Sequence, residues 1–107
     1  MGDDTGFTVL WEFVVAPSAL VEFRRAYGPA GDWAALFRRG EGHVETRLLE
    51  DRSLPGRFVT VDRWTSAEAY RAFRERFASE YETLDAACAG WTEREKFLGE
   101  FEASPRA

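Results

Sequence analysis

The segment that most restricts the fold is residues 7–16, FTVLWEFVVA, which is rich in aromatic and β-branched residues and predicts a β-strand. Strand alternation gives this segment one fully apolar face, formed by Phe7, Val9, Trp11, Phe13 and Val15. The opposite face is partly apolar, because Leu10 and Val14 lie on it. A strand that is apolar on both faces needs cover on both sides of its sheet.

Turn and cap residues predict two short helices after this strand. Pro17 and Ser18 open a helix that runs to about Tyr27, and the Gly-Pro-Ala-Gly sequence at 28–31 ends it. Asp32 is predicted to cap a second helix that runs through Arg39. The apolar side of that helix consists of Trp33, Leu36 and Phe37.

The second half of the chain predicts a hairpin, a long helix and a last strand. Residues 43–52 and 57–65 are strand-like, and Ser-Leu-Pro-Gly at 53–56 forms the turn between them. Ser66 is predicted to cap one long helix that ends at Gly90. The apolar stripe of this helix consists of Tyr70, Phe73, Phe77, Tyr81, Leu84 and Cys88. Residues 91–102 predict a strand with Phe97 and Phe101 on one face.

The order of these elements, β-α-(α)-β-β-α-β, predicts an α+β fold of the ferredoxin-like, split βαβ type. This fold has a four-stranded antiparallel sheet with helices on one face. The other face of the sheet is left open, although the strand at 7–16 and Val59 and Val61 carry apolar side chains toward it. A homodimer that packs sheet against sheet covers such a face economically.

Composition excludes several classes of function. The chain has 107 residues, which predicts one domain over 1–107 with a core of about 7–101. The net charge is −5, so nucleic acid and anionic membrane surfaces are not expected partners. The chain lacks a signal peptide and a run long enough to span a membrane, which predicts a cytoplasmic protein. Cys88 and His43 are the only residues of their types, so one chain offers no thiolate metal cluster and no pair of histidines.

The segment at 58–73, FVTVDRWTSAEAYRAF, resembles the antibiotic biosynthesis monooxygenase (ABM) family. A strand that ends in Trp, followed by a helix cap and an aromatic pair, is a hallmark of that family. The segment at 27–39 also resembles one branch of it, and the similarity covers about residues 7–101. The resemblance implies a dimeric α+β barrel with a pocket in each subunit between sheet and helices. Quinone-forming members oxygenate a polycyclic phenol or anthrone there with O₂, without metal or flavin.

The resemblance also implies which positions face the pocket. Trp64 and Tyr70 match the strand-end Trp of the family and the Tyr six residues after it. Thr60 stands where the quinone-forming members have Asn, and Leu84 stands near their Arg. A haem-degrading branch uses an Asn and a helical His, but this chain has no Asn, and Arg74 stands near the His position. Haem degradation by that route is therefore not expected.

Each candidate residue has a functional and a structural interpretation. Trp64 and Tyr70 stack on an aromatic substrate, or they are plain core. Asp62 lies on the same strand face as Trp64. If it is buried among aromatic residues, its pKa rises and the carboxylate becomes a usable base. The alternative is that Asp62 forms a salt bridge with Arg47. We predict the catalytic residues Asp62, Trp64 and Tyr70. The predicted substrate-binding residues are Thr60, Trp64, Tyr70, Trp33, Phe37 and His43. No metal site is predicted.

Two functions follow from this sequence. The first is a cofactor-independent monooxygenase that acts on a small aromatic or quinol-type substrate, and it rests on the aromatic residues and Asp62. The second is a non-catalytic dimeric barrel that binds an apolar or aromatic ligand. Thr60 and Leu84, which replace two polar positions, favour this second function.

Overall fold

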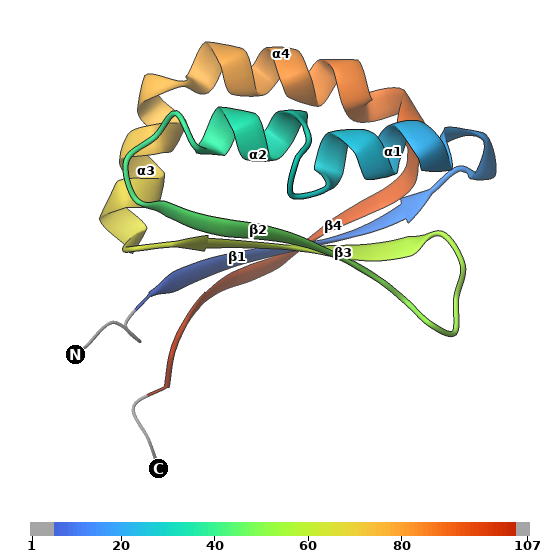
Figure 1. Cartoon of the computed structure of the whole chain (residues 1–107), viewed down its shortest axis with the longest axis horizontal. Helices are drawn as coiled ribbons and strands as arrows, with labels where there is room; N and C mark the ends of the chain where they lie inside the picture. Colours follow the sequence, from blue (N-terminus) through green and yellow to red (C-terminus); the bar gives the residue numbers. More distant parts are fainter. Residues whose placement is uncertain (1–5, 105–107) are drawn as a thin grey trace.

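The computed structural model of the chain describes residues 6–104. Four strands and four α-helices follow one another along these residues in the order β-α-α-β-β-α-α-β (Figure 1). Their bounds are β1 Phe7–Val15, α1 Leu20–Tyr27, α2 Asp32–Phe37, β2 His43–Glu50, β3 Arg57–Trp64, α3 Ala67–Arg76, α4 Ala78–Cys88 and β4 Thr92–Glu102. Short 3₁₀ turns at Pro17–Ala19 (η2) and Ala89–Trp91 (η3) precede α1 and β4. Over this range, no helix is both long and apolar enough to span a membrane.

The strands form one antiparallel sheet in the order β2-β3-β1-β4, and the helices all lie on one side of it (Figure 1). This arrangement confirms the predicted ferredoxin-like α+β fold. Strand boundaries agree with the predicted ones to within two residues.

Strand register separates the two faces of the sheet. On β3 every second residue is buried beneath the helices, namely Phe58, Thr60, Asp62 and Trp64. Phe7, Val9 and Phe13 of β1 lie opposite Trp64, Asp62 and Phe58 and share this face. The core therefore lies between the sheet and the helices, and the predicted alternation on β1 and β3 holds.

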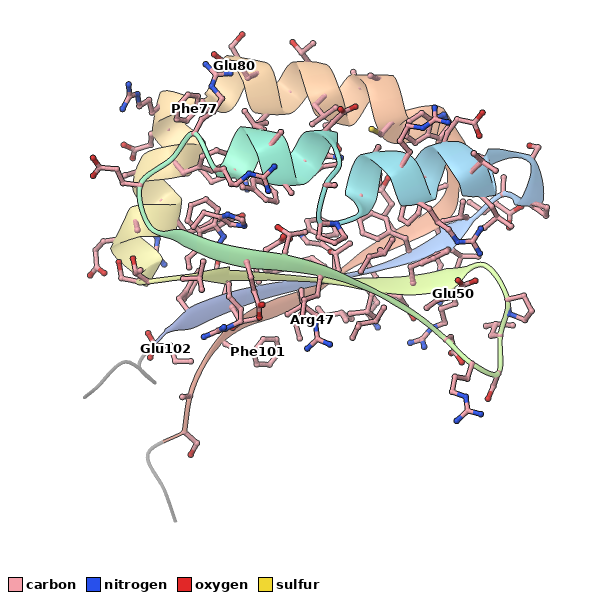
Figure 2. The ribbon with its side chains drawn as sticks, in the orientation of Figure 1. Arg47, Glu50, Phe77, Glu80, Phe101 and Glu102 are labelled. Atoms are coloured by element: carbon pink, nitrogen blue, oxygen red, sulfur yellow. The ribbon has the colours of Figure 1, made fainter. Side chains whose placement is uncertain are left out.

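The open face of the sheet keeps a mixture of apolar and charged side chains. Figure 2 shows Arg47 and Phe101 on this side, away from the helices. Leu49 and Phe101 are 42% and 47% exposed, and Val61 is only half-buried. Glu12 is buried here, in ion pairs with Arg57 and Arg94.

The predicted single long helix is in fact two helices, because the backbone leaves the helical conformation at Phe77 (φ −108°, ψ 27°). The Phe77 ring is buried against Phe73, and the guanidinium groups of Arg39 and Arg76 lie over it. Figure 2 places Phe77 and Glu80 at this corner. The apolar stripe continues through the corner, so helical periodicity does not reveal the break.

The second helix is also shorter than predicted and is capped differently. It ends at Phe37, and Asp32 is its first helical residue instead of its cap. Gly31 occupies the cap position, and a Cβ atom added there would lie 2.2 Å from the carbonyl oxygen of Arg25. The close approach of α1 and α2 therefore requires glycine at this position.

The prediction that Phe97 and Phe101 share a face is wrong. The register between β1 and β4 shifts by one residue, so that Phe97 lies opposite Trp11 while Phe101 lies opposite Thr8. Gly99 adopts φ +138° at this β-bulge, a conformation that side chains disfavour. The extra residue turns the end of β4 over, and Phe101 points to the open face.

Candidate functional site

A cavity of about 250 Å³ lies between the helices and the centre of the sheet. Strand β1 supplies Val9, Trp11 and Phe13 to its wall, β2 supplies Thr46, β3 supplies Thr60 and Asp62, and β4 supplies Glu95. The helices supply Tyr27, Trp33, Phe37, Tyr70, Arg74, Tyr81 and Asp85. Seven of these fourteen wall residues carry an aromatic ring, which suits a flat ligand.

Asp62 is the buried carboxylate of this cavity, at 7% exposure. Desolvation raises its pKa to about 6, and the hydroxyl of Thr46, which donates a 2.7 Å hydrogen bond to Oδ1, partly opposes this rise. The alternative salt bridge to Arg47 is wrong, because Arg47 lies opposite Val61 on the other face of the sheet (Figure 2). The pKa of Asp62 therefore lies in the range that suits a general base at neutral pH.

Tyr70 and Arg74 bring polar atoms to the cavity from helix α3. Arg74 lies one turn after Tyr70, and its Nη1 donates a 3.0 Å hydrogen bond to the Tyr70 hydroxyl. The guanidinium also lies 3.9 Å from the ring centroid of Tyr81 on α4. Burial raises the pKa of Tyr81 to about 12, so its phenol stays neutral at physiological pH. The fixed guanidinium can stabilise a negative charge that develops on a bound ligand.

Trp64 lies behind the cavity wall, which corrects the prediction that it lines the site. The side chain is completely buried, and its ring packs against Phe37, His43, Tyr70 and Phe73. Its indole Nε1 has no hydrogen-bond partner among residues 6–104. Trp64 therefore supports Phe37 and Tyr70, whose own side chains reach the cavity.

His43 also lies behind the wall and not on it, contrary to the prediction. Its ring is half-buried between Phe37 and Trp64, and Nε2 lies 2.9 Å from Oγ1 of Thr46. Burial lowers the pKa of His43, and so does the charge of Arg38. The imidazole thus reaches the cavity only through Thr46, which bonds to Asp62.

The structure brings the other predicted residues together. Thr60 and Asp62 line the floor from β3, and Trp33 and Phe37 line the opposite wall from α2. The Trp33 ring is buried against Tyr27, Phe37 and Tyr81, so this residue belongs to the core and also lines the cavity.

Sequence reasoning missed several wall residues, of which Arg74 matters most. By resemblance, Leu84 stands near the position of the family's Arg, whereas the cavity receives its guanidinium from Arg74, ten residues earlier. The available signal was spacing, because Arg74 follows Tyr70 by four residues and therefore shares its helix face. Thr46 is not found from the sequence, because only the register of β2 against β3 brings its side chain to Asp62.

Comparison with known proteins places this chain in a family. The family model described as antibiotic biosynthesis monooxygenase matches residues 6–99. No curated protein matches the chain.

Several solved structures resemble the chain in fold. SnoaB, a cofactor-independent oxygenase from Streptomyces nogalater, is 24% identical with a TM-score of 0.69, and the match covers 95% of this chain and 96% of SnoaB. A candidate antibiotic biosynthesis monooxygenase from Bordetella bronchiseptica is 14% identical with a TM-score of 0.76, over 94% and 99% of the two chains. One from Nitrosomonas europaea is 17% identical with a TM-score of 0.70, over 92% and 90%. The fold is shared, and the family match covers most of the sequence: this chain belongs to the antibiotic biosynthesis monooxygenase family.

Proposed function

We propose that this protein is a cofactor-independent monooxygenase that oxidises a small aromatic or quinol-type substrate, with Asp62 as its base. The observation that carries the proposal is the buried Asp62 carboxylate, which has a pKa of about 6 and lies in the wall of an aromatic cavity. Membership of the family and the fold shared with SnoaB support the same reaction class.

The size of the cavity restricts the substrate. Pockets for drug-sized ligands occupy roughly 300–1,000 Å³, and this cavity of about 250 Å³ is smaller. A ligand with one or two fused rings suits it better than a four-ring polyketide. Trp11, Phe13 and Phe37 offer ring faces for stacking, while Asp62 and Arg74 mark two polar positions on the wall.

The reaction begins with proton transfer. The ionised Asp62 takes a proton from a substrate hydroxyl or an activated C–H group, which leaves the substrate as an anion. Arg74, held by Tyr70, stabilises the negative charge on the substrate oxygen. The anion transfers an electron to O₂ far more readily than the neutral substrate does.

The oxidation balances without a further reductant. The substrate radical and superoxide combine to form a C–O bond, and the remaining proton of that carbon then leaves as the O–O bond breaks. One oxygen atom becomes a ring carbonyl and the other leaves as water. A phenol plus O₂ thus gives a para-quinone plus water, and the substrate supplies all four electrons.

A second copy of the chain is the proposed cover for the open face of the sheet. Leu10, Leu49 and Val61 lie on that face and are only partly buried within one chain. A homodimer that packs these faces together leaves one complete cavity in each subunit.

Oxygen consumption tests the proposed activity. Metal-stripped protein is incubated with hydroquinones, naphthols and anthrones in an oxygen electrode, and binding of each compound is measured by calorimetry. With naphthols and anthrones, whose reacting carbon carries hydrogen, we expect uptake of one O₂ per quinone formed, with Asp62→Asn at least about 100-fold slower, as for loss of a general base. Glu82→Gln, an exposed carboxylate change on α4, is the matched control and keeps the full rate. Ligand binding without oxygen uptake for every compound would instead establish the non-catalytic barrel.

A further inference from the structure

Three side chains form a hydrogen-bonded chain from the cavity to a half-exposed imidazole. The Thr46 hydroxyl lies 2.7 Å from Oδ1 of Asp62, and the same oxygen lies 2.9 Å from Nε2 of His43. Asp62 and Thr46 are buried at 7% and 8% exposure, whereas the ring of His43 is partly open to solvent.

A β-bulge in β2 creates this alignment. The pairing of β2 with β3 shifts by one residue between His43 and Glu45, so that His43 lies opposite Trp64 while Thr46 lies opposite Asp62. Strict alternation would place His43 and Thr46, three residues apart, on opposite faces. The extra residue, Val44, brings both side chains to the helix-facing side.

The donors and acceptors of the chain can reverse together. An ionised carboxylate only accepts, so Thr46 donates to Asp62 and accepts from the Nε2–H group of His43. Once Asp62 carries a proton, the half-exposed imidazole releases its Nε2 proton to water and takes one from water on Nδ1, so that Asp62 donates to Thr46 and Thr46 donates to Nε2. A hydroxyl and a neutral imidazole each provide both functions, so both hydrogen bonds survive the reversal.

A bound substrate makes such a route necessary. The carboxylate is already almost shielded from solvent, and a flat ligand in the cavity covers its remaining open side. A proton taken from that ligand then leaves Asp62 through its hydrogen-bond partner, Thr46.

We infer that Thr46 and His43 are positioning residues that form the proton exit of Asp62. The inference deepens the proposed monooxygenase function and rests on it. The proton of Asp62 passes to Oγ1 of Thr46 as the hydroxyl proton of Thr46 passes to Nε2 of His43. The resulting imidazolium releases its Nδ1 proton to water, which returns the chain to its starting state with Asp62 ionised.

Other charged groups face this chain from the packed elements. Arg38 of the α2 terminus and Glu45 of β2 act on His43, and they oppose each other in its titration. Tyr70 and Arg74 from α3, Tyr81 and Asp85 from α4, and Glu95 from β4 face the cavity of Asp62. Neither hydrogen bond of the Thr46 hydroxyl involves any of these groups, so a change at Thr46 isolates the coupling between Asp62 and His43.

The single histidine makes the coupling directly measurable. Untagged protein with ¹⁵N-labelled histidine gives one imidazole, whose nitrogen shifts report tautomer and charge as pH changes. We expect Nε2 to be protonated at pH 8. Besides the inflection from the titration of His43 itself, we expect the pH curve of the nitrogen shifts to have a second inflection near pH 6, where Asp62 titrates. Thr46→Val, which keeps the shape and removes the hydroxyl, and Asp62→Asn should each abolish that inflection. Thr46→Ser should retain it.

Superimposable titrations of wild type and Thr46→Val, or an imidazole protonated on Nδ1 at pH 8, would overturn the inference.

A kinetic measurement distinguishes a role of Thr46 in positioning from a role in folding. With a substrate that turns over, Thr46→Val should lower kcat about tenfold with KM little changed, and Thr46→Ser should restore kcat.

The two proposals fail in different ways. If the imidazole senses Asp62 but no compound is oxidised, the hydrogen-bonded chain is upheld and the proposed reaction is wrong. If oxidation proceeds and Thr46→Val matches wild type in both kcat and imidazole titration, the proton exit is wrong and the reaction stands.

Discussion

At the scale of single residues, the decisive feature is a carboxylate on an aromatic sheet face. Alternation from Trp64 predicts that Asp62 points toward the helices, and the structure places it there. Its partner is not predictable in the same way, because the register of β2 against β3, which pairs Thr46 with Asp62, is not visible in the sequence. Hydrophobic patterns locate a buried position, whereas the register between strands decides which polar groups meet there.

Burial of Asp62 has a consequence for stability. Its pKa is about 6 in the folded protein against an ordinary value of 3.8, so folding favours the protonated form. The contribution of Asp62 to the free energy of unfolding is therefore fully present below about pH 4 and is lost as pH rises to about 6. Asp62→Asn does not titrate, so its free energy of unfolding should exceed that of wild type by about 2–3 kcal/mol at pH 8, and by little at pH 4.

Urea unfolding at pH 4 and pH 8 measures this difference. His43 titrates in both proteins, and the burial that lowers its pKa makes the folded state less stable in acid; comparing the two proteins at each pH therefore isolates Asp62. Equal stabilities of the two proteins at pH 8 would show that Asp62 is well solvated.

The position of Trp64 leads to a second residue-scale prediction. Because its fully buried ring packs on four other rings behind the cavity, Trp64→Ala should lower the free energy of unfolding by about 3–5 kcal/mol. Trp64→Phe should bind an aromatic ligand nearly as wild type does in calorimetry. A loss of ligand binding in Trp64→Phe without a loss of stability would show that Trp64 contacts the ligand directly.

At the scale of elements, local breaks shape the site more than the regular segments do. The strands, the hairpin and the helix after Ser66 are predictable from alternation, turn residues and a cap that the structure shows, in which the Ser66 hydroxyl accepts from the Ala69 amide. The corner at Phe77 and the bulge at Gly99 interrupt elements whose apolar spacing continues. Both interruptions depend on tertiary contacts, which the spacing of apolar residues along the sequence does not reveal.

The junction of α1 and α2 provides a prediction at this scale. Gly31 allows α2 to lie close to α1, which places Trp33 and Phe37 on the cavity wall. Gly31→Ala would bring a Cβ atom 2.2 Å from the Arg25 carbonyl oxygen, so we expect a loss of about 1–3 kcal/mol in unfolding free energy. Gly90→Ala is the matched control, because no atom lies within 4 Å of its added Cβ. Similar melting temperatures for the two variants would contradict this account.

At the scale of the whole molecule, the helices cover only one face of the sheet (Figure 1), and we propose that a second copy of the chain covers the other. The chain should sediment as a dimer of 12.2 kDa subunits at micromolar concentration. Val61→Arg places a charge in the middle of the open face and should yield monomers, whereas Glu82→Arg, on the helix side, should leave the dimer intact. A wild-type protein that stays monomeric would show that the open face needs no partner.

The central claim is that Asp62 drives an oxidation without a metal or flavin, and the pH profile of oxygen uptake tests it most directly. The measurement uses chelator-treated, flavin-free protein with the best substrate, between pH 4.5 and 8.5. We predict that kcat/KM rises with pH to a plateau with a midpoint near 6, the pKa of Asp62, and that Asp62→Asn abolishes this ionisation and nearly all of the rate. Activity lost on chelation and restored by one metal, or an unchanged profile in Asp62→Asn, would contradict the account.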